Sequence, residues 1–502
     1  MEYLSRQLSL LNNDGEFKFH PKCGSLKISH LIFADDLLLF SKGDVKSVLK
    51  IYQCVKKFGA ISGLEANLTK CSIFYGGVDD TIKNEIYNHI GFPEGVLPFR
   101  YLGLPLIAKR LSFVDCSPLF QKISNQFQDW KKHRTLSYAG RMQIIKSIIL
   151  GVQIFWTSCY ILPSRVLQKI DDLCRDFLWG RSDHSLKAPL VSWDKVCTGK
   201  NQGGLGIFSA TTWNLATAVR TLWYVHSNKE CLWIKWVHGT YLKESNIWQV
   251  RVKTGDSWLW KQLLKARDKA VNLVGGTDML IQSIRSCYNQ SKIQLSELNL
   301  VGGTDMLIQS IRSCFYQSKI QLSELYKILS PTNVNVSVPW ADTVWESSIL
   351  PKQSFILWFA IQNRLLTKDR LLKRGVIQSN QCSLCEGGSE SHKHLFFDSS
   401  FSMTVWNGVM EWLKFSWRTC DWRLLLDWYC NSLKVKGSKL KVKRMALAAS
   451  VYYIWRERNE RIFKSKSRSS GQIIRDIKVD LYTAILNNLS LPNEDWGWFL
   501  SL

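Results

Sequence analysis

The chain has 502 residues, enough for roughly three compact domains at about 150 residues each. It is 46% hydrophobic and 21% charged, values that exclude bulk disorder, collagen-like and coiled-coil composition. Lys and Arg number 66 against 41 Asp and Glu, which leaves a formal net charge of +25. A surplus of this size fits a phosphate-bearing partner, either nucleic acid or an anionic membrane surface.

Cysteine content and the first residues indicate a reducing compartment. The 14 cysteines fall far short of the ~8–10% typical of a disulfide scaffold. Residues 1–16 lack the basic segment and apolar run of a secretory signal. We therefore expect reduced thiols and an intracellular protein, nuclear or cytoplasmic. The most apolar stretch, 144–162, contains polar residues such as Lys146 and Gln153, so we expect a buried helix there and no membrane partner.

The first 110 residues are predicted to mix strands with helices. The expected elements are, in chain order, a helix at 1–11, a strand at 31–33, a tight turn at 34–36, a strand at 37–40, an amphipathic helix at 45–58 and short strands at 71–75 and 99–106.

The remainder of the chain is predicted to be mainly helical, so the fold class is α+β and predominantly α. Ser137 is expected to cap a helix with an apolar stripe that includes Ile145 and Trp156. The glycine-rich loop 199–206 is expected to be exposed. The predicted domains are 1–110, 111–330, 331–425 and 426–502, the last being a basic helical tail.

One segment is repeated. Residues 272–298 recur at 299–325, with only Tyr288 changed to Phe315 and Asn289 to Tyr316. A solenoid needs about three or more diverged repeats to bury a continuous face, so this pair indicates a tandem duplication instead. We expect one copy alone to occupy the ancestral packing position, with the residue pairs Thr277–Asp278 and Thr304–Asp305 capping the helix that follows in each copy.

Asp35 and Asp36 lie at the predicted turn between two apolar strands. Adjacent carboxylates suit Mg²⁺, which takes oxygen ligands and shares substrate phosphates. Two such ions can activate an attacking hydroxyl and stabilise a leaving oxygen in phosphoryl transfer. The plain alternative is a solvated turn, because Asp is common in turns.

Several ordered segments resemble the reverse transcriptases of plant non-long-terminal-repeat retrotransposons. HLIFADDLLLF, GLEANLTKCSIFYGG and YLGLPL resemble the last three palm motifs. WKKHRTLSYAGRMQIIKSIILGVQIFWTSCYILP resembles the thumb, PLVSWDKVCTGKNQGGLGI the connection, and QCSLCEGGSESHKHLFF the zinc-binding region. The resemblance runs from residue 1 to about 465 in the family's order. It implies RNA-directed DNA polymerisation with two Mg²⁺ ions, Asp35 as the main metal-binding carboxylate and Asp36 as its partner.

The resemblance also implies roles for two other places in the palm. Lys70 matches the lysine that assists the departing pyrophosphate, although an ordinary exposed lysine is the alternative. Tyr101, Leu102 and Gly103 match the hairpin that grips the primer end, with plain core packing as the alternative.

The chain departs from the family upstream of the hairpin. The complete enzyme carries a further catalytic Asp on an earlier palm strand, and basic fingers that hold the nucleotide. Only 34 residues precede Asp35, and Asp14 lies in an NNDGE loop. We therefore expect a truncated palm with an incomplete Mg²⁺ site and no polymerase activity. No endonuclease or ribonuclease H pattern is found, and neither activity is expected.

Cys382-x₂-Cys385 followed by His392 and His394 is a reasonable start for a tetrahedral Zn²⁺ site. The resemblance assigns Cys382, Cys385 and His394 as ligands and expects a further Cys where Ser399 stands. His392 is a candidate fourth ligand, but two residues apart in an extended segment point to opposite faces. A metal-free remnant is the alternative.

Basic and aromatic content point to a nucleic-acid partner, namely RNA, DNA or an RNA–DNA hybrid. The candidate phosphate-binding residues are Lys434, Lys436, Lys439, Lys441, Lys443 and Arg444. A solvated linker or a nuclear-import signal fits this run equally well. For the tryptophans, we favour helix-core positions over base stacking; the set comprises Trp233, Trp236, Trp258, Trp260, Trp345 and Trp358.

The sequence thus predicts a fragment of a retrotransposon reverse transcriptase with Mg²⁺ ancestrally and Zn²⁺ as cofactors, and without a defined protein partner. Two alternatives stay open: a non-catalytic nucleic-acid-binding protein that uses its basic surface, and a translated relic without a selected role. An open reading frame upstream that encodes the missing palm would favour the enzyme.

Overall fold

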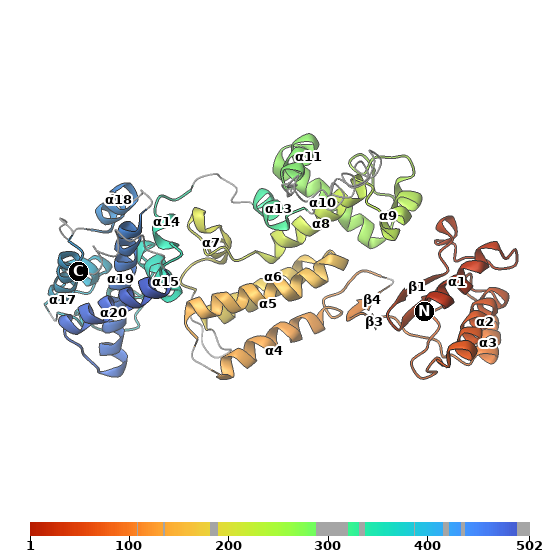
Figure 1. Ribbon diagram of the computed structural model, residues 1–502, viewed down its shortest axis with the longest axis horizontal. Helices are drawn as coiled ribbons and strands as arrows, with labels where there is room; N and C mark the ends of the chain where they lie inside the picture. Colours follow the sequence, from red (N-terminus) through yellow and green to blue (C-terminus); the bar gives the residue numbers. More distant parts are fainter. Residues whose placement is uncertain are drawn as a thin grey trace, which may run out of the picture. The chain divides into compact units, whose positions relative to one another are not determined.

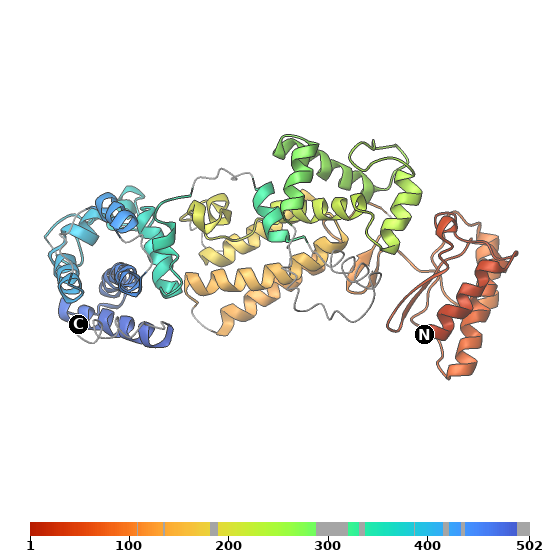
Figure 2. The same cartoon turned by 45° about the horizontal axis from the view of Figure 1, so that its top comes forward.

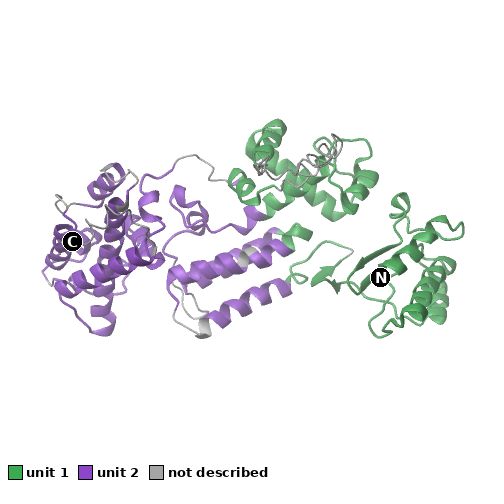
Figure 3. Ribbon diagram, in the orientation of Figure 1, with its two compact units in different colours: residues 1–116, 156–163, 214–329 green, residues 117–155, 164–213, 330–502 purple. Residues whose placement is uncertain are grey.

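The computed structural model describes residues 1–107, 109–133, 136–180, 189–287, 320–330, 337–385, 387–414, 421–432 and 437–488. Within them helices predominate, and the named strands form two antiparallel two-stranded sheets (Figure 1). The chain forms two compact units, one of residues 1–116, 156–163 and 214–329 and one of residues 117–155, 164–213 and 330–502 (Figure 3). The predominantly helical α+β fold class is confirmed, whereas the four predicted domain boundaries stay a prediction.

The N-terminal part of the first unit contains both sheets. Its elements are α1 (Glu2–Leu10), β1 (His30–Phe33), β2 (Asp36–Leu39), α2 (Val45–Ser62), α3 (Asp80–Ile90), β3 (Phe99–Tyr101) and β4 (Leu104–Leu106), with short 3₁₀ turns at Leu11–Asn13 and Gly24–Leu26. Three leucines recur at helical spacing near the N-terminus: Leu4, Leu8 and Leu11. They pack with Phe17 and with Ile51, which lies in α2. Asp44 caps α2 by accepting a hydrogen bond from the Ser47 amide at 2.9 Å.

The predicted hairpin at 31–40 is present. β1 pairs with β2 from His30 opposite Leu39 to Phe33 opposite Asp36, so the turn is Ala34–Asp35 and Asp36 is the first residue of β2. The strand predicted at 71–75 is wrong, because only Ile73 pairs, in an isolated bridge to Glu94. The single strand predicted at 99–106 is instead the β3–β4 hairpin.

The rest of the first unit is helical. It contains the larger part of α8 (Ala210–His226), α9 (Leu232–Val237), a short π-helix (His238–Leu242), α10 (Trp258–Val274), α11 (Thr277–Ser286) and α13 (Leu322–Leu329). α11 begins at Thr277 with Gly276 as its N-cap, at φ 147°, so the Thr277–Asp278 pair lies inside the first turn rather than before it. Thr304 and Asp305 of the second copy lie outside the described residues.

The second unit begins with α4 (Ser117–His133), most of α5 (Tyr138–Cys159), α6 (Ser164–Trp179), α7 (Trp193–Cys197) and a 3₁₀ turn (Lys200–Gln202). The predicted cap of α5 is confirmed, since the Ser137 hydroxyl accepts a hydrogen bond from the Gly140 amide at 3.2 Å. By length and composition alone α5 could cross a membrane, but buried helices of soluble proteins pass the same test, and its Ile145, Val152 and Trp156 are buried.

The prediction of an exposed glycine-rich loop at 199–206 is confirmed for residues 199–201 and wrong for residues 203–205. Gly203 and Gly204 are buried. A Cβ on Gly204 would lie 2.2 Å from the Thr198 carbonyl oxygen, and Gly203 has φ 83° and accepts a hydrogen bond from the Trp358 indole at 2.8 Å. The glycines therefore allow close backbone packing rather than a flexible loop.

The C-terminal part of the second unit is built around one long helix. Its elements are α14 (Ala341–Val344), α15 (Pro351–Ile361), α16 (Lys368–Lys373), a short π-helix (His394–Asp398), α17 (Ser400–Trp412), α18 (Trp422–Ser432), α19 (Ser438–Lys464) and α20 (Ser470–Asn488). α19 packs against α14, α15, α17 and α20 (teal to blue helices in Figure 2). Residues 445–450 of α19 are all buried. The segment predicted as a tail therefore supplies core residues.

Candidate functional site

Three of the predicted zinc ligands meet in the second unit. The ligand atoms of Cys382, Cys385 and His394 all lie within 4.8 Å of one another, and Cys385 Sγ is 3.2 Å from His394 Nε2. Tetrahedral Zn²⁺ with ordinary Zn–S and Zn–N bonds places sulfur and nitrogen ligands about 3.5 Å apart. The three side chains therefore fit a zinc ion with little adjustment.

A tight hairpin holds the two cysteines. Gln381 bridges to Ser389, and the Cys382 amide donates to the Gly388 carbonyl at 2.7 Å. A Cβ on Gly388 would lie 2.9 Å from the His394 ring, so glycine leaves the space that the imidazole occupies. This hairpin brings residues nine positions apart to one point, because the chain reverses between Cys385 and His394.

The hairpin also polarises the thiols. Burial alone would raise the pKa of Cys385, but the Gly387 amide and the neighbouring Ser399 and His394 side chains lower that pKa to about 7. Burial raises the pKa of Cys382, against the effect of the Leu384 and Cys385 amides. Because zinc binds thiolates, a thiol that ionises near neutral pH loses its proton to solvent at little cost when zinc binds.

The fourth position around this centre is occupied by a poor ligand. Ser399 is fully buried, and its hydroxyl has no hydrogen-bond partner of good geometry although it lies close enough to Cys385 to lower that thiol's pKa. The described residues thus offer three zinc ligands and one buried hydroxyl where the family pattern expects a cysteine.

The structure does not bring His392 to the cluster. Its ring packs against Phe396 and Trp422 at 5.2 and 5.4 Å, and burial followed by the charge of Arg370 lowers its pKa to about 4. His392 is thus a neutral core residue, whose Nε2 lacks a hydrogen-bond partner. It is not the fourth ligand here.

The palm hairpin offers a different arrangement. Asp35 and Asp36 are exposed at the β1–β2 turn, and no third Asp, Glu, His or Cys among the described residues joins them in a cluster within 4.8 Å. Asp14 is held elsewhere by Lys50, whose hydrogen bond at 2.6 Å lowers the carboxyl pKa. Lys70 lies in an exposed turn, with its amide bonded to Asn67. The described residues of this chain therefore supply two adjacent Mg²⁺ ligands there.

The candidate primer-grip residues form the tip of the second hairpin. Tyr101 is half-buried and pairs with Leu104 at the end of β3. Leu102 is exposed at φ 50°, and Gly103 follows at φ 81°. A left-handed leucine presents its side chain at a turn tip, where it is accessible to a partner.

The basic run is only partly available for phosphate. Lys434 and Lys436 lie outside the described residues, whereas Lys439, Lys441 and Lys443 lie in the first turns of α19. Arg444 forms an ion pair with Glu346 at 2.8 Å in which both side chains are about 12–13% exposed. Arg444 is therefore a structural residue.

Among the tryptophans assigned to the helix core, Trp260 and Trp358 are buried whereas Trp233 is 37% exposed. The buried pair agrees with the packing interpretation, and Trp233 does not.

The buried charges behind the three candidate zinc ligands were not predicted from the sequence. Glu390 and Arg458 are almost fully buried and joined by an ion pair at 2.7 Å, and Arg461 contacts the cysteine hairpin. The available signal was RERNER at 456–461, a density of both charge signs that is unusual for a phosphate-binding surface.

Two family models match separate parts of the chain. Residues 3–106 match the family model described as reverse transcriptase (RNA-dependent DNA polymerase), and residues 321–406 match the model described as zinc-binding in reverse transcriptase. An Arabidopsis thaliana protein named for ribonuclease H is 23% identical over 446 residues, which cover 77% of this chain and 70% of that protein. An uncharacterized mitochondrial protein of the same plant is 22% identical over 120 residues, 24% of this chain and 78% of that protein.

The reverse transcriptase match precedes the zinc-binding match along the chain. The alignment with the first plant relative covers most of this chain and most of that relative. The chain is therefore similar, over these two segments, to reverse transcriptases of the plant retrotransposon type.

Proposed function

We propose that this chain is a retrotransposon-derived, zinc-stabilised protein that binds RNA, DNA or an RNA–DNA hybrid, and that it does not extend a primer by itself. The observation that carries the proposal is the convergence of Cys382, Cys385 and His394 inside the region that matches a reverse transcriptase zinc-binding model. Zinc bound there would fix the cysteine hairpin against the π-helix and stabilise this fold.

Two observations support nucleic-acid binding: the net positive charge of the chain and its similarity to reverse transcriptases. The chain carries a net charge of +25, and both matched families act on nucleic acid in reverse transcription. Lysines that neutralise phosphates release counterions, so binding should weaken steeply as salt rises. The exposed hairpin tip at Leu102 and the lysines at the start of α19 are candidate contacts.

The experiment measures anisotropy of a fluorescent single-stranded RNA with the full chain from 50 to 200 mM salt. We expect affinity to fall by orders of magnitude if six or more phosphates are contacted, roughly 10³-fold or more. Replacing Lys439, Lys441 and Lys443 by Gln should weaken binding, and a control with Lys261, Lys265 and Lys269 of α10 replaced should show the smaller loss. Affinity that is flat with salt would contradict the proposal.

Primer extension is the second test. Two-metal phosphoryl transfer relies on ligands that surround both ions, and the described residues offer only Asp35 and Asp36 at the hairpin. We expect no extension of an RNA-templated primer with Mg²⁺ or Mn²⁺. Extension that is lost in Asp35→Ala would mean that another carboxylate of this chain completes the site.

We further propose a nuclear or cytoplasmic location without a membrane partner. The described cysteines are all free thiols, as expected in a reducing compartment. Imaging of a fluorescent fusion expressed in plant cells tests the location, and membrane fractionation of the same cells tests α5.

A further inference from the structure

One arginine of α19 contacts the backbone between the two zinc-binding cysteines. Nη1 of Arg461 donates hydrogen bonds to the carbonyl oxygens of Ser383 and Leu384, at 3.2 and 3.1 Å. These two residues are the x₂ of the Cys-x₂-Cys hairpin. Arg461 lies about 80 residues further along the chain, well outside the segment that matches the zinc-binding family model.

The N–H groups of the same two peptide units lie near the Cys382 sulfur. The amides of Leu384 and Cys385 lie close enough to the sulfur of Cys382 to lower the pKa of that thiol. Each amide belongs to the peptide unit whose carbonyl, on Ser383 or Leu384, accepts from Arg461. A guanidinium on the oxygen of a planar peptide fixes its orientation and strengthens donation by its N–H. Arg461 thus fixes the orientation of the two peptide planes that lie between the cysteines.

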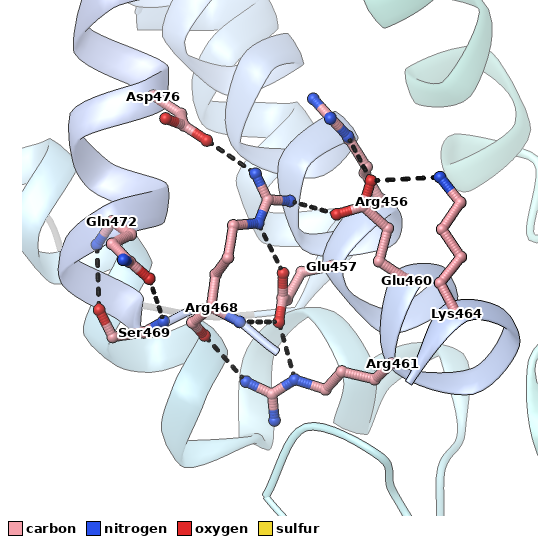
Figure 4. Close-up of polar contacts among 9 residues, drawn as sticks. All are labelled: Arg456, Glu457, Glu460, Arg461, Lys464, Arg468, Ser469, Gln472 and Asp476. Atoms are coloured by element: carbon pink, nitrogen blue, oxygen red, sulfur yellow. Dashed lines mark hydrogen bonds and ion pairs between the residues drawn. The ribbon is translucent and has the colours of Figure 1, made fainter. Parts of the chain in front are cut away.

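Arg461 is itself held firmly. Its Nε donates to Glu457 Oε1 at 2.8 Å, and Glu457 is fully buried (Figure 4). Arg468 binds the same carboxylate: its backbone amide donates to Oε1 at 2.8 Å and its Nε to Oε2 at 3.0 Å. Arg461 Nη2 donates to the Arg468 carbonyl at 3.1 Å, and its guanidinium lies 4.7 Å from the Phe401 ring centroid.

Arg468 extends this network to the next helix. It pairs with Asp476 of α20 at 2.8 Å and with Glu460 of α19 at 3.0 Å (Figure 4). The network therefore ties the orientation of Arg461 to the packing of α19 on α20. Glu457 is its centre, because one buried carboxylate accepts from two arginines.

A second contact attaches the same face of α19 to the hairpin. Arg458, one helical turn before Arg461, binds the carboxylate of Glu390 at 2.7 Å and the Leu366 carbonyl at 3.2 Å. Glu390 follows Ser389, the residue that closes the hairpin by pairing with Gln381. Residues three apart on a helix share a face, so α19 contacts the outgoing and the returning arms of the hairpin together.

We propose that Arg461, oriented by Glu457, is a positioning residue for the zinc centre, and that α19 and α20 belong to the zinc-binding module. The inference rests on the proposed zinc site. Zinc affinity and the order of α19 are then linked: loss of the Arg461 contacts weakens zinc binding, and zinc protects α19 from local opening.

The test compares zinc affinity of the full chain with Arg461→Met, Arg461→Lys and Glu457→Gln, by competition with a chromogenic chelator. Outer-shell substitutions typically weaken metal binding about 10- to 100-fold, and we expect Arg461→Met in that range. Arg461→Lys keeps the charge but loses the fork that reaches both carbonyls and Glu457, so it should also bind zinc more weakly. The control on the same helix is Arg456→Met, because Arg456 contacts Glu460 and Tyr453 and reaches Arg461 only indirectly, through Glu460 and Arg468.

Two further readouts separate positioning from general damage. The absorption bands of the Co²⁺-loaded protein should keep their wavelengths in Arg461→Met, because the ligands are unchanged. Hydrogen exchange should show that zinc slows opening of 450–464 in the original chain, and less so in Arg461→Lys. If Arg461→Met does not fold, the Lys and Glu457→Gln variants carry the same comparison.

The outcomes are distinguishable. Two results would overturn the role of Arg461 without contradicting the zinc site. One is a zinc affinity equal to that of the original chain in all three variants. The other is an equal loss of zinc affinity in Arg456→Met. Failure of the original chain to bind zinc would overturn the zinc site itself, and the inference with it.

Discussion

The palm hairpin and the cysteine hairpin are both candidate metal sites, and they are built in opposite ways. Asp35 and Asp36 are neighbours in sequence, exposed on a two-stranded sheet. Cys382, Cys385 and His394 converge from a hairpin and a π-helix, with a buried helix behind them. The cysteine hairpin also has buried partners for its backbone, which the described part of the palm hairpin does not show.

This difference shows what a metal site demands of a fold. Adjacent carboxylates supply charge, but an ion also needs ligands on other sides, and those come from separate elements. Separate elements stay in place only if their own polar groups are satisfied, as Glu390 and Arg458 are at 0% and 2% side-chain exposure. The cysteine hairpin meets both conditions within one chain.

The largest expected effect is the loss of metal. Cys382→Ser removes a buried thiolate ligand, and a site left with Cys385 and His394 should not retain zinc through gel filtration. We expect zinc content to fall from about one per chain to near zero, measured by elemental analysis. The matched control is Cys174→Ser, a buried cysteine of α6 outside the cluster. Equal zinc content in both variants would show that the cysteine hairpin is not the site.

Breaking the buried ion pair should cost the most stability. Glu390→Gln leaves Arg458 buried without its counter-charge, which costs about 3–5 kcal/mol of unfolding free energy. Urea denaturation followed by tryptophan fluorescence measures it. The control, Asp80→Asn, removes a carboxylate that is 90% exposed in its pair with Lys83, and we expect no measurable change. A small loss for Glu390→Gln would mean that water reaches this pair.

Restoring the fourth ligand should strengthen the zinc site. Ser399 is fully buried beside Cys385, so Ser399→Cys places a thiolate where the structure has a hydroxyl. We expect zinc affinity to rise at least about tenfold, which is ~1.4 kcal/mol. Chelator competition measures the affinity, and Ser399→Ala, which removes the hydroxyl that lowers the Cys385 pKa, should bind zinc no more tightly than the original chain. An unchanged affinity in Ser399→Cys would mean that residue 399 does not face the metal.

Local patterns predicted the hairpins and most helices, because spacing and capping are encoded within a few residues. The β1–β2 hairpin, α2 and the Ser137 cap follow from such patterns. Long-range contacts were not predictable in this way. Burial of the Gly203–Gly204 loop depends on Trp358, and the role of Arg461 depends on a hairpin about 80 residues earlier. The sequence predicted the three candidate zinc ligands, but it did not predict the charged residues of α19 that contact their hairpin.

A small effect is expected at the palm hairpin. Asp35 and Asp36 are exposed, so Asp35→Ala and Asp36→Ala should shift the melting temperature by less than about 2 °C. The positive control is Leu8→Ala, which removes a fully buried side chain from the neighbouring core and should lower stability by about 2–5 kcal/mol. Addition of millimolar Mg²⁺ should leave all melting temperatures unchanged. A Mg²⁺-dependent rise that disappears in Asp35→Ala would contradict the comparison.

The smallest effect is expected from removal of one repeat. The described structure uses the first part of one copy and the end of the other: α11 packs through Leu280 and Ile284, and α13 through Leu325. The Gln321 amide donates to the Cys287 carbonyl at 2.9 Å, so the ends of both described parts meet.

Deleting 299–325 leaves one complete copy followed by Tyr326, and the same side chains can fill the same positions. We expect an unchanged or slightly higher melting temperature by calorimetry, because a connection that is 27 residues shorter costs less entropy to close. Ile284→Ala, which leaves a cavity at a fully buried position, should lower it clearly and shows that the assay senses packing in this region. A comparable drop in the deletion would mean that both copies contribute to the core.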